Sequence, residues 1–247
     1  MELWTVQHTC SLIPSVIVMA GVCVLLRLWL GKKDLKVRMI PFQILACVLF
    51  ALEIGKQVLS FMRGYDLYHI PFHFCSLFIF MLPIAAFYNG KHANTVRGLT
   101  AALCAAVFLL MMAYPALIYG ASDIEHFFDD YFAFHTVAFH NIVIFEFFLI
   151  LALRLHEPAT KREQRLIVLF VLAFCVVCGV MSQVLKTNYN NMYHCNVPPL
   201  EALRLSMQPV LGYGVTQTLY VLIVTAVDIG FVLMAYWLYR GLRRLFK

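Results

Sequence analysis

Long apolar runs recur along the whole sequence, and polar residues gather in short stretches between them. An α-helix needs about 20 mostly apolar residues to cross the hydrocarbon core of a bilayer. On that rule the pattern predicts seven spans, at residues 12–30, 40–62, 70–88, 98–119, 131–155, 166–185 and 213–239. No soluble domain, low-complexity tract or repeat separates them. We therefore expect an all-α membrane protein, a seven-helix bundle that forms one domain over residues 1–247.

Composition supports this interpretation. The sequence is 62% hydrophobic and 13% charged, whereas a soluble domain carries roughly 25% charged residues. The formal net charge is +6, but in a membrane protein the distribution of Lys and Arg matters more than their sum, because it sets the topology. The charge therefore gives no reason to expect a nucleic-acid partner.

The lysines and arginines lie almost entirely on one side of the predicted spans. They cluster within residues 27–38, 91–97, 154–165 and 240–247. The other side carries only Arg63, Lys186 and Arg204, and Lys56 lies inside a span. By the positive-inside rule, the N-terminus faces outward and the C-terminus faces the cytoplasm. We expect a multi-pass protein of the plasma membrane.

The histidines show the opposite bias. Those on or near the outer side are His8, His69, His73, His126, His135, His140 and His194, whereas only His92 and His156 lie on the inner side. Outer loops that lack Lys and Arg explain part of this bias. They do not explain His73 and His140, which lie inside predicted spans. A polar side chain in the hydrocarbon core is energetically unfavourable unless it has partners or a function. We expect the chemistry in the outer half of the bundle, at a site that faces the extracytoplasmic side.

The stretch His69-Ile-Pro-Phe-His-Phe-Cys-Ser76 opens the third predicted span and places Cys75 close to His73. With 1.5 Å of rise per residue, Cys75 lies roughly 8 Å into the third span and His140 roughly 13 Å into the fifth, near the depth of phospholipid ester bonds. A thiol near a histidine can be deprotonated, attack an ester and hold the acyl group as a thioester. On the residues alone, a small buried cysteine with hydrogen-bonded histidines is the simpler interpretation.

A metal site is an alternative. His69 and His73 are spaced i, i+4, which places both on one face of a helix and suits zinc. Further ligands would come from His126, Asp129, Asp130, His135 and His140. A zinc-dependent intramembrane lipid hydrolase would use such a set, chiefly His69, His73, His126 and His135. However, no stretch has the spacing of a known metal motif, and Pro71 leaves the start of the helix open.

Glu53 and Lys56 form a third feature, a pair of opposite charges spaced i, i+3 inside the second span. Such residues can pair across one helical turn, and inside a membrane they would not remain unpaired. We favour a structural ion pair. The alternative is a transporter of ions or small molecules, in which Glu146 and Asp228 extend the polar path. Transporters often show internal repeats or broken helices in matching halves, and this sequence shows neither.

The loop that follows the sixth span is rich in amides and tyrosines. Asn188, Tyr189 and Tyr193 are candidates for binding a lipid headgroup or for donating hydrogen bonds to an oxyanion. An ordinary surface loop is the alternative. Among the cysteines, Cys175 and Cys178 form a C-x-x-C within a predicted span, where packing is favoured over redox or metal chemistry.

These motifs, in this order, resemble the YwaF-like family of bacterial integral membrane proteins. The matching stretches are Pro71-Phe-His73-Phe-Cys75, then residues 124–140 with His126, His135 and His140, then Lys186–Tyr193, then Pro198. The vertebrate relative of that family is a cysteine-centred acyltransferase that builds ether phospholipids. The resemblance implies that Cys75 is the nucleophile and His140 its partner, with His135 as the alternative. The chain departs from the family pattern at Asn190-Asn191, which widens the last motif.

Together these observations predict an acyltransferase or transacylase that acts on a membrane phospholipid or lysolipid without a cofactor. Cys75 would carry the acyl group, His140 or His135 would act as the base, and His73 would orient or replace it. Residues expected to contact the substrate are Asn188, Tyr189, Tyr193, His69 and His126. The sequence leaves open whether the acceptor is a lysophospholipid, a glycolipid or a lipoprotein amine, and it leaves open the oligomeric state.

Overall fold

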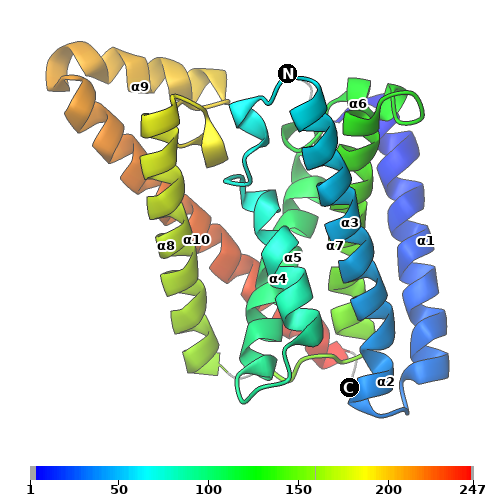
Figure 1. The fold of residues 1–247 in the computed structure, drawn as a ribbon. Helices are drawn as coiled ribbons and strands as arrows, with labels where there is room; N and C mark the ends of the chain where they lie inside the picture. Colours follow the sequence, from blue (N-terminus) through cyan, green and yellow to red (C-terminus); the bar gives the residue numbers. More distant parts are fainter. Residues whose placement is uncertain (1–3, 159, 246–247) are drawn as a thin grey trace.

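The protein is a bundle of long helices that stand side by side (Figure 1). The structure is a computed structural model that describes residues 4–158 and 160–245. All the regular structure within these residues is helical, which confirms the all-α class. Among the described residues, six helices are long and apolar enough to cross a membrane. They are α1 (Val6–Leu30), α3 (Ile40–Met62, preceded by the short α2, Leu35–Arg38), α5 (Ala93–Ala113), α7 (Tyr131–Ala152), α8 (Thr160–Leu185) and α10 (Tyr213–Leu245).

The third predicted span differs from the expectation. Its regular α-helix is α4 (Leu77–Phe87), which has only 11 residues, and two one-turn 3-10 helices precede it, η1 (Leu67–His69) and η2 (Phe74–Ser76). The backbone is extended at Ile70 and at His73. Pro71 explains this, because proline lacks an N–H and drives the residue before it out of the helical region. His69 and His73 therefore do not share a helix face, and the predicted i, i+4 pair is wrong.

The two ends of the bundle carry different short elements. One end, named here the α9 end, holds η3 (Pro115–Leu117), α6 (Ala121–Glu125), η4 (Tyr189–Asn191) and α9 (Pro198–Leu211). The N-terminus lies at this end and the C-terminus at the opposite end, named here the C-terminal end (Figure 1). α5 stops at Ala113, earlier than predicted, because Pro115 disfavours a helical conformation at Tyr114.

The packed core lies between α5, α7 and α10. Four alanines of α5 are fully buried, namely Ala101, Ala102, Ala105 and Ala106. Small residues allow neighbouring helices to approach closely in a membrane. By contrast, α1 and α10 expose many large apolar side chains, such as Trp29 at 73% and Leu222 at 59% exposure. These faces suit contact with lipid chains.

A buried polar cluster joins α10 to α8 at the C-terminal end. His156 lies 2.8 Å from the Tyr239 hydroxyl through Nδ1 and 2.7 Å from Glu163 Oε1 through Nε2. The Tyr236 hydroxyl donates to the other oxygen of Glu163 at 2.5 Å. All four side chains are at most 1% exposed, and every hydrogen-bonding group of His156 has a partner. Satisfied polar networks of this kind rigidify a core, so the cluster fixes this end of α10.

Candidate functional site

A cavity of about 520 Å³ lies within the half of the bundle nearer the α9 end. It is walled by α3, α5, α7, α10, the stretch that leads into α4 and the loop that follows α8. Its polar lining residues are Glu53, Lys56, Tyr68, His69, His73, Cys75, Ser76, His135, Thr136, His140, Asn188, Asn190, Asn191, Asn196 and Asp228. The fold therefore gathers most of the candidate residues of the sequence, which lie far apart along the chain, around one cavity.

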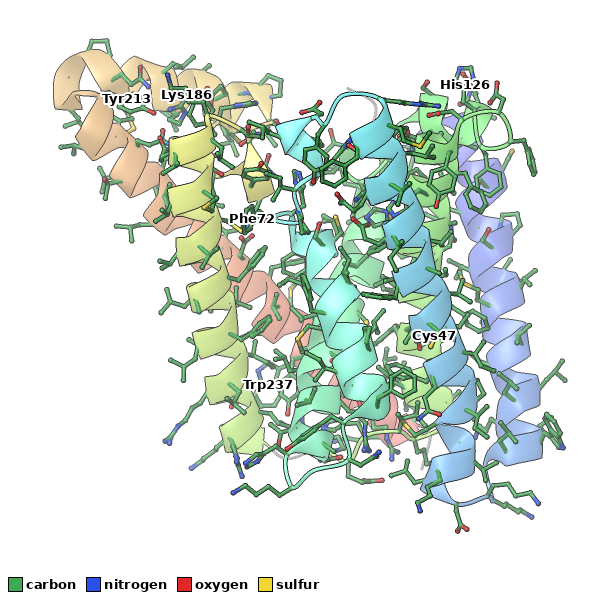
Figure 2. The ribbon with its side chains drawn as sticks, in the orientation of Figure 1. Cys47, Phe72, His126, Lys186, Tyr213 and Trp237 are labelled. Carbon is green, nitrogen blue, oxygen red and sulfur yellow. The ribbon has the colours of Figure 1, made fainter. Side chains whose placement is uncertain are left out.

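Cys75 reaches this cavity from the irregular stretch before α4. The backbone is extended at His73, which precedes the 3-10 helix η2. In this turn the Ser76 N–H donates to the His73 carbonyl at 2.9 Å. The Cys178 thiol of α8 donates to the carbonyl of Phe72 at 3.0 Å, which ties the stretch to α8. Figure 2 shows Phe72 in this position beside α8. The cysteine is thus held on a short, braced turn rather than within a long helix.

His140 lines the cavity from α7, and the backbone fixes its tautomer. Its Nδ1 lies 2.6 Å from the carbonyl oxygen of Thr136. A carbonyl oxygen only accepts hydrogen bonds, so Nδ1 carries the proton and donates it. In the neutral ring, Nε2 is then the unprotonated nitrogen. A histidine held in this tautomer is prepared to act as a general base.

His135 is positioned differently, because it faces the Glu53–Lys56 pair. Its Nε2 lies 3.1 Å from Glu53 Oε2, an ion-pair distance, although the angle is outside that of a hydrogen bond. The other oxygen of Glu53 accepts from Lys56 Nζ at 2.8 Å and from Gln57 at 2.7 Å. The expected ion pair is therefore present and is extended by a histidine. The Nε2 of His135 thus faces a carboxylate, whereas the Nε2 of His140 is the unprotonated nitrogen of its neutral ring.

The other two histidines of the cavity, His69 and His73, make contacts with neighbouring segments. His69 Nδ1 lies 2.6 Å from the Ser60 hydroxyl, and the His69 ring stacks on Phe132 at a centroid distance of 5.1 Å. His73 Nε2 donates to the carbonyl of Tyr68 at 3.1 Å. The Nδ1 of His73 is then the accepting nitrogen of its neutral ring.

The loop after α8 contributes Asn188 to the cavity wall, and several of its side chains form hydrogen bonds within the protein. Asn188 lines the cavity, yet its Oδ1 accepts from the backbone N–H groups of Tyr193 and His194, both at 3.1 Å. Tyr189 is fully buried, and its hydroxyl donates to the Leu67 carbonyl. Neither Tyr189 nor Tyr193 lines the cavity. The two tyrosines therefore serve the structure of the loop, and their predicted contact with substrate finds no support in the geometry.

Asn190 and Asn191 place polar groups in the cavity that the sequence reasoning missed. Both have a positive φ, 49° and 57°, a conformation that Asn tolerates better than most residues. As a result, Asn190 Nδ2 donates to Asp228 Oδ2 of α10 at 2.7 Å. The signal was present in the sequence as the widened last motif, since two adjacent asparagines favour a left-handed turn.

His126 lies outside the site. It stands on the surface next to α6, at a corner of the bundle separate from Phe72 (Figure 2). Its Nδ1 lies 3.1 Å from Asp129, and this hydrogen bond to a carboxylate raises the pKa of His126. Its predicted contact with substrate, and its predicted share in a metal site, therefore do not fit the structure. Among the described residues, no group of three or more His, Cys, Asp and Glu side chains is arranged to hold a metal ion.

Glu146 and the remaining thiols differ in their relation to the cavity. Glu146 is fully buried away from the cavity, and its carboxylate oxygens have no hydrogen-bond partner among the described residues. The Cys175 thiol lies 3.5 Å from Asp228, so Cys175 and Cys178 both contact the site as well as packing. Cys10 and Cys195 are free thiols.

Comparison with known proteins gives one match. No curated protein and no solved structure matches the chain. A model of one protein family matches residues 3–238, nearly the whole chain, and the protein therefore belongs to the TMEM164 family.

Proposed function

We propose that this protein is an intramembrane acyltransferase in which Cys75 carries the acyl group as a thioester and His140 is the base. The observation that carries the proposal is the arrangement around one cavity. Cys75 lines it, and so does a histidine whose Nδ1 is bound to the Thr136 carbonyl, which leaves Nε2 to accept a proton. The resemblance of the sequence motifs to the YwaF-like family and its cysteine-centred vertebrate relative supports the same chemistry.

The reaction proceeds in two halves. First, His140 Nε2 takes the proton of the Cys75 thiol, and the thiolate attacks the ester carbonyl of a lipid. The tetrahedral adduct then breaks the bond between carbon and alkoxide oxygen, and the departing lysolipid oxygen receives the proton from His140. In the second half, His140 takes a proton from the hydroxyl of an acceptor lysolipid, which attacks the thioester and restores the thiol. This is covalent catalysis with a general base.

The charged residues of the cavity have supporting roles. The Lys56 ammonium is the one Lys or Arg cation that lines the described cavity, and it suits the negative charge that develops on the ester oxygen. Glu53 holds both Lys56 and His135 in place. The basic residues near the C-terminal end favour a plasma-membrane orientation with this end in the cytoplasm, which puts the cavity on the extracytoplasmic side.

The proposal is tested with purified protein in lipid nanodiscs that contain a phospholipid with a radiolabelled acyl chain and an unlabelled lysolipid. Two signals are measured, label transferred to the lysolipid and label on the protein that hydroxylamine releases. Cys75→Ala should lose both, whereas Cys47→Ala, at an exposed position of α3, should retain both. Equal labelling of Cys75→Ala and the native protein would remove Cys75 from the mechanism.

Histidine variants then identify the base. His140→Gln should slow thioester formation by about 10²–10⁴-fold, the usual contribution of a general base. His135→Gln should have a smaller effect on this step, because its ring faces Glu53. A larger loss in His135→Gln than in His140→Gln would reverse the assignment.

A further inference from the structure

The wall of the cavity is partly polar and partly apolar. The histidines, asparagines and Cys75 described above supply polar groups. The apolar lining residues are Phe74, Ala106, Val107, Leu110, Leu117, Ile118, Phe132, Phe139, Val227, Phe231 and Val232. A molecule with a polar group and a hydrocarbon chain would fit this cavity in one orientation.

The cavity extends well into the bundle. Asp228, which lines the cavity, lies 3.5 Å from Cys175 of α8. Cys175 is ten residues before the end of α8 at Leu185, which corresponds to about 15 Å along the helix axis. Taking the end of α8 as the edge of a hydrocarbon core about 30 Å thick, Asp228 and its neighbour Val227 lie at about half its depth.

At this depth the cavity is open to the side. Val227 lines the cavity and is nevertheless 62% exposed. On α10, Asp228 faces α8 through Cys175, and Val227 occupies the edge of the lining face that is turned away from α8. The half-buried Leu110, Leu117 and Ile118, on α5 and around η3, line the cavity as well. The edge of the cavity at Val227 is named here the side opening, and Leu110, Leu117 and Ile118 line the cavity nearer the α9 end.

The helix arrangement explains the opening. α5 and α10 pack closely in the core, and toward the α9 end α10 leans away from the bundle to reach α9 (Figure 1). Along this part of α10, Val227 remains exposed. Its side chain is apolar, so it does not oppose the entry of a hydrocarbon chain.

We propose that the side opening is the passage through which the acyl chain of a lipid in the surrounding leaflet enters the cavity. The role assigned to this passage rests on the proposed function, whereas the position of the opening does not. A chain in the leaflet already lies at the depth of Val227, and it enters without leaving an apolar environment. Its ester group then lies among the polar residues near Cys75, at the depth where a phospholipid carries it.

The passage is tested by blocking it with Val227→Trp. The matched control is Leu222→Trp, at a lipid-facing position of the same helix with 59% exposure. Both variants also carry Cys75→Ala, so that the lipid is bound but not consumed. A phospholipid with a diazirine in the middle of one acyl chain is photolysed in nanodiscs, and labelled peptides are identified by mass spectrometry. Peptides with residues 110–118 and 227–232 should be labelled in Cys75→Ala and in the Leu222→Trp variant, and not in the Val227→Trp variant. Equal labelling in both tryptophan variants would overturn the passage.

A second measurement keeps this test separate from the proposed function. With Cys75 restored, Val227→Trp should lower acylation by a long-chain phospholipid about tenfold or more, a modest loss for a misplaced substrate. Acylation of Cys75 by a short-chain, water-soluble thioester should stay near the native rate. If native protein forms no thioester with either donor, the proposed function fails, and the photolabelling result alone decides the passage. Loss of both reactions to the same degree in Val227→Trp would count against a passage specific for acyl chains.

Discussion

Replacing Glu53 with glutamine tests the buried network that joins α3 to α7. The carboxylate contacts Lys56 at 2.8 Å, Gln57 at 2.7 Å and His135 at 3.1 Å, and its side chain is 5% exposed. Glutamine has nearly the same shape but no charge. The Lys56 ammonium, 15% exposed, would remain in the cavity without its counter-ion.

The expected loss of stability follows from that unpaired cation. Removing one partner of a buried pair typically destabilises by about 3–5 kcal/mol. Because Lys56 still faces the cavity, the lower end of this range applies, and we expect the free energy of unfolding to fall by about 3 kcal/mol. For a chain of this length, that loss lowers the Tm by roughly 6–12 °C. Removing Lys56 as well, in Glu53→Gln/Lys56→Met, should restore much of it, since no charge is then left unpaired.

The assay is thermal unfolding in detergent, followed by the fraction of protein that still elutes as a monodisperse peak. The control is Glu125→Gln, because Glu125 contacts Gln7 on the exposed surface at 2.8 Å and should contribute little. A double variant that is no more stable than Glu53→Gln would refute the reasoning. A Tm for Glu53→Gln within about 2 °C of the native value would refute it as well.

Two further predictions concern parts of the molecule outside the cavity. In Gly98→Ala, the new Cβ would lie 2.7 Å from His156 Nε2, so the buried cluster at the C-terminal end must shift, and we expect a loss of about 1–3 kcal/mol in thermal unfolding. Gly230→Ala is its control, because nothing lies within 4 Å of that Cβ, and a similar loss in both would contradict the packing argument. Near α9, the hydrogen bond from Arg204 lowers the pKa of Glu201. Its stabilisation is therefore present above the ordinary pKa of Glu and disappears as the pH falls through the lowered value. Between pH 7 and pH 3, the free energy of unfolding of the native protein should then fall by about 1 kcal/mol more than that of Glu201→Gln. Parallel profiles of the free energy of unfolding against pH would disprove this.

The sequence predicted the long helices well, because a chain in lipid must satisfy its backbone internally and an apolar run of sufficient length has few alternatives. The third span was predicted less well. Pro71 signalled an irregular start, but only the tertiary structure shows how far the irregular stretch extends and that a thiol from α8 braces it.

The sequence indicated which residues lie at the candidate site better than it indicated what each of them does there. Cys75 and His140, for which the sequence predicted similar depths, line one cavity together with His135. Roles depend on partners that are distant in the chain, and no local pattern reveals those. Tyr189 contacts the carbonyl of Leu67, and Asn190 contacts Asp228. No local feature of the sequence distinguishes the amides and tyrosines of the loop that face inward from those that do not.

The length of α10 has a consequence for the membrane around the protein. The helix has 33 residues, which corresponds to about 50 Å, whereas the hydrocarbon core measures about 30 Å. A hydrophobic helix that exceeds the bilayer thickness can tilt, and thicker bilayers require less tilt. Figure 1 shows α10 inclined relative to the other long helices. Since the cluster around His156 anchors one end of α10, a change in tilt is expressed at the other end. Bilayer thickness is thereby coupled to the distance between α10 and α5. A change in lipid composition that alters bilayer thickness would therefore alter the tilt of α10.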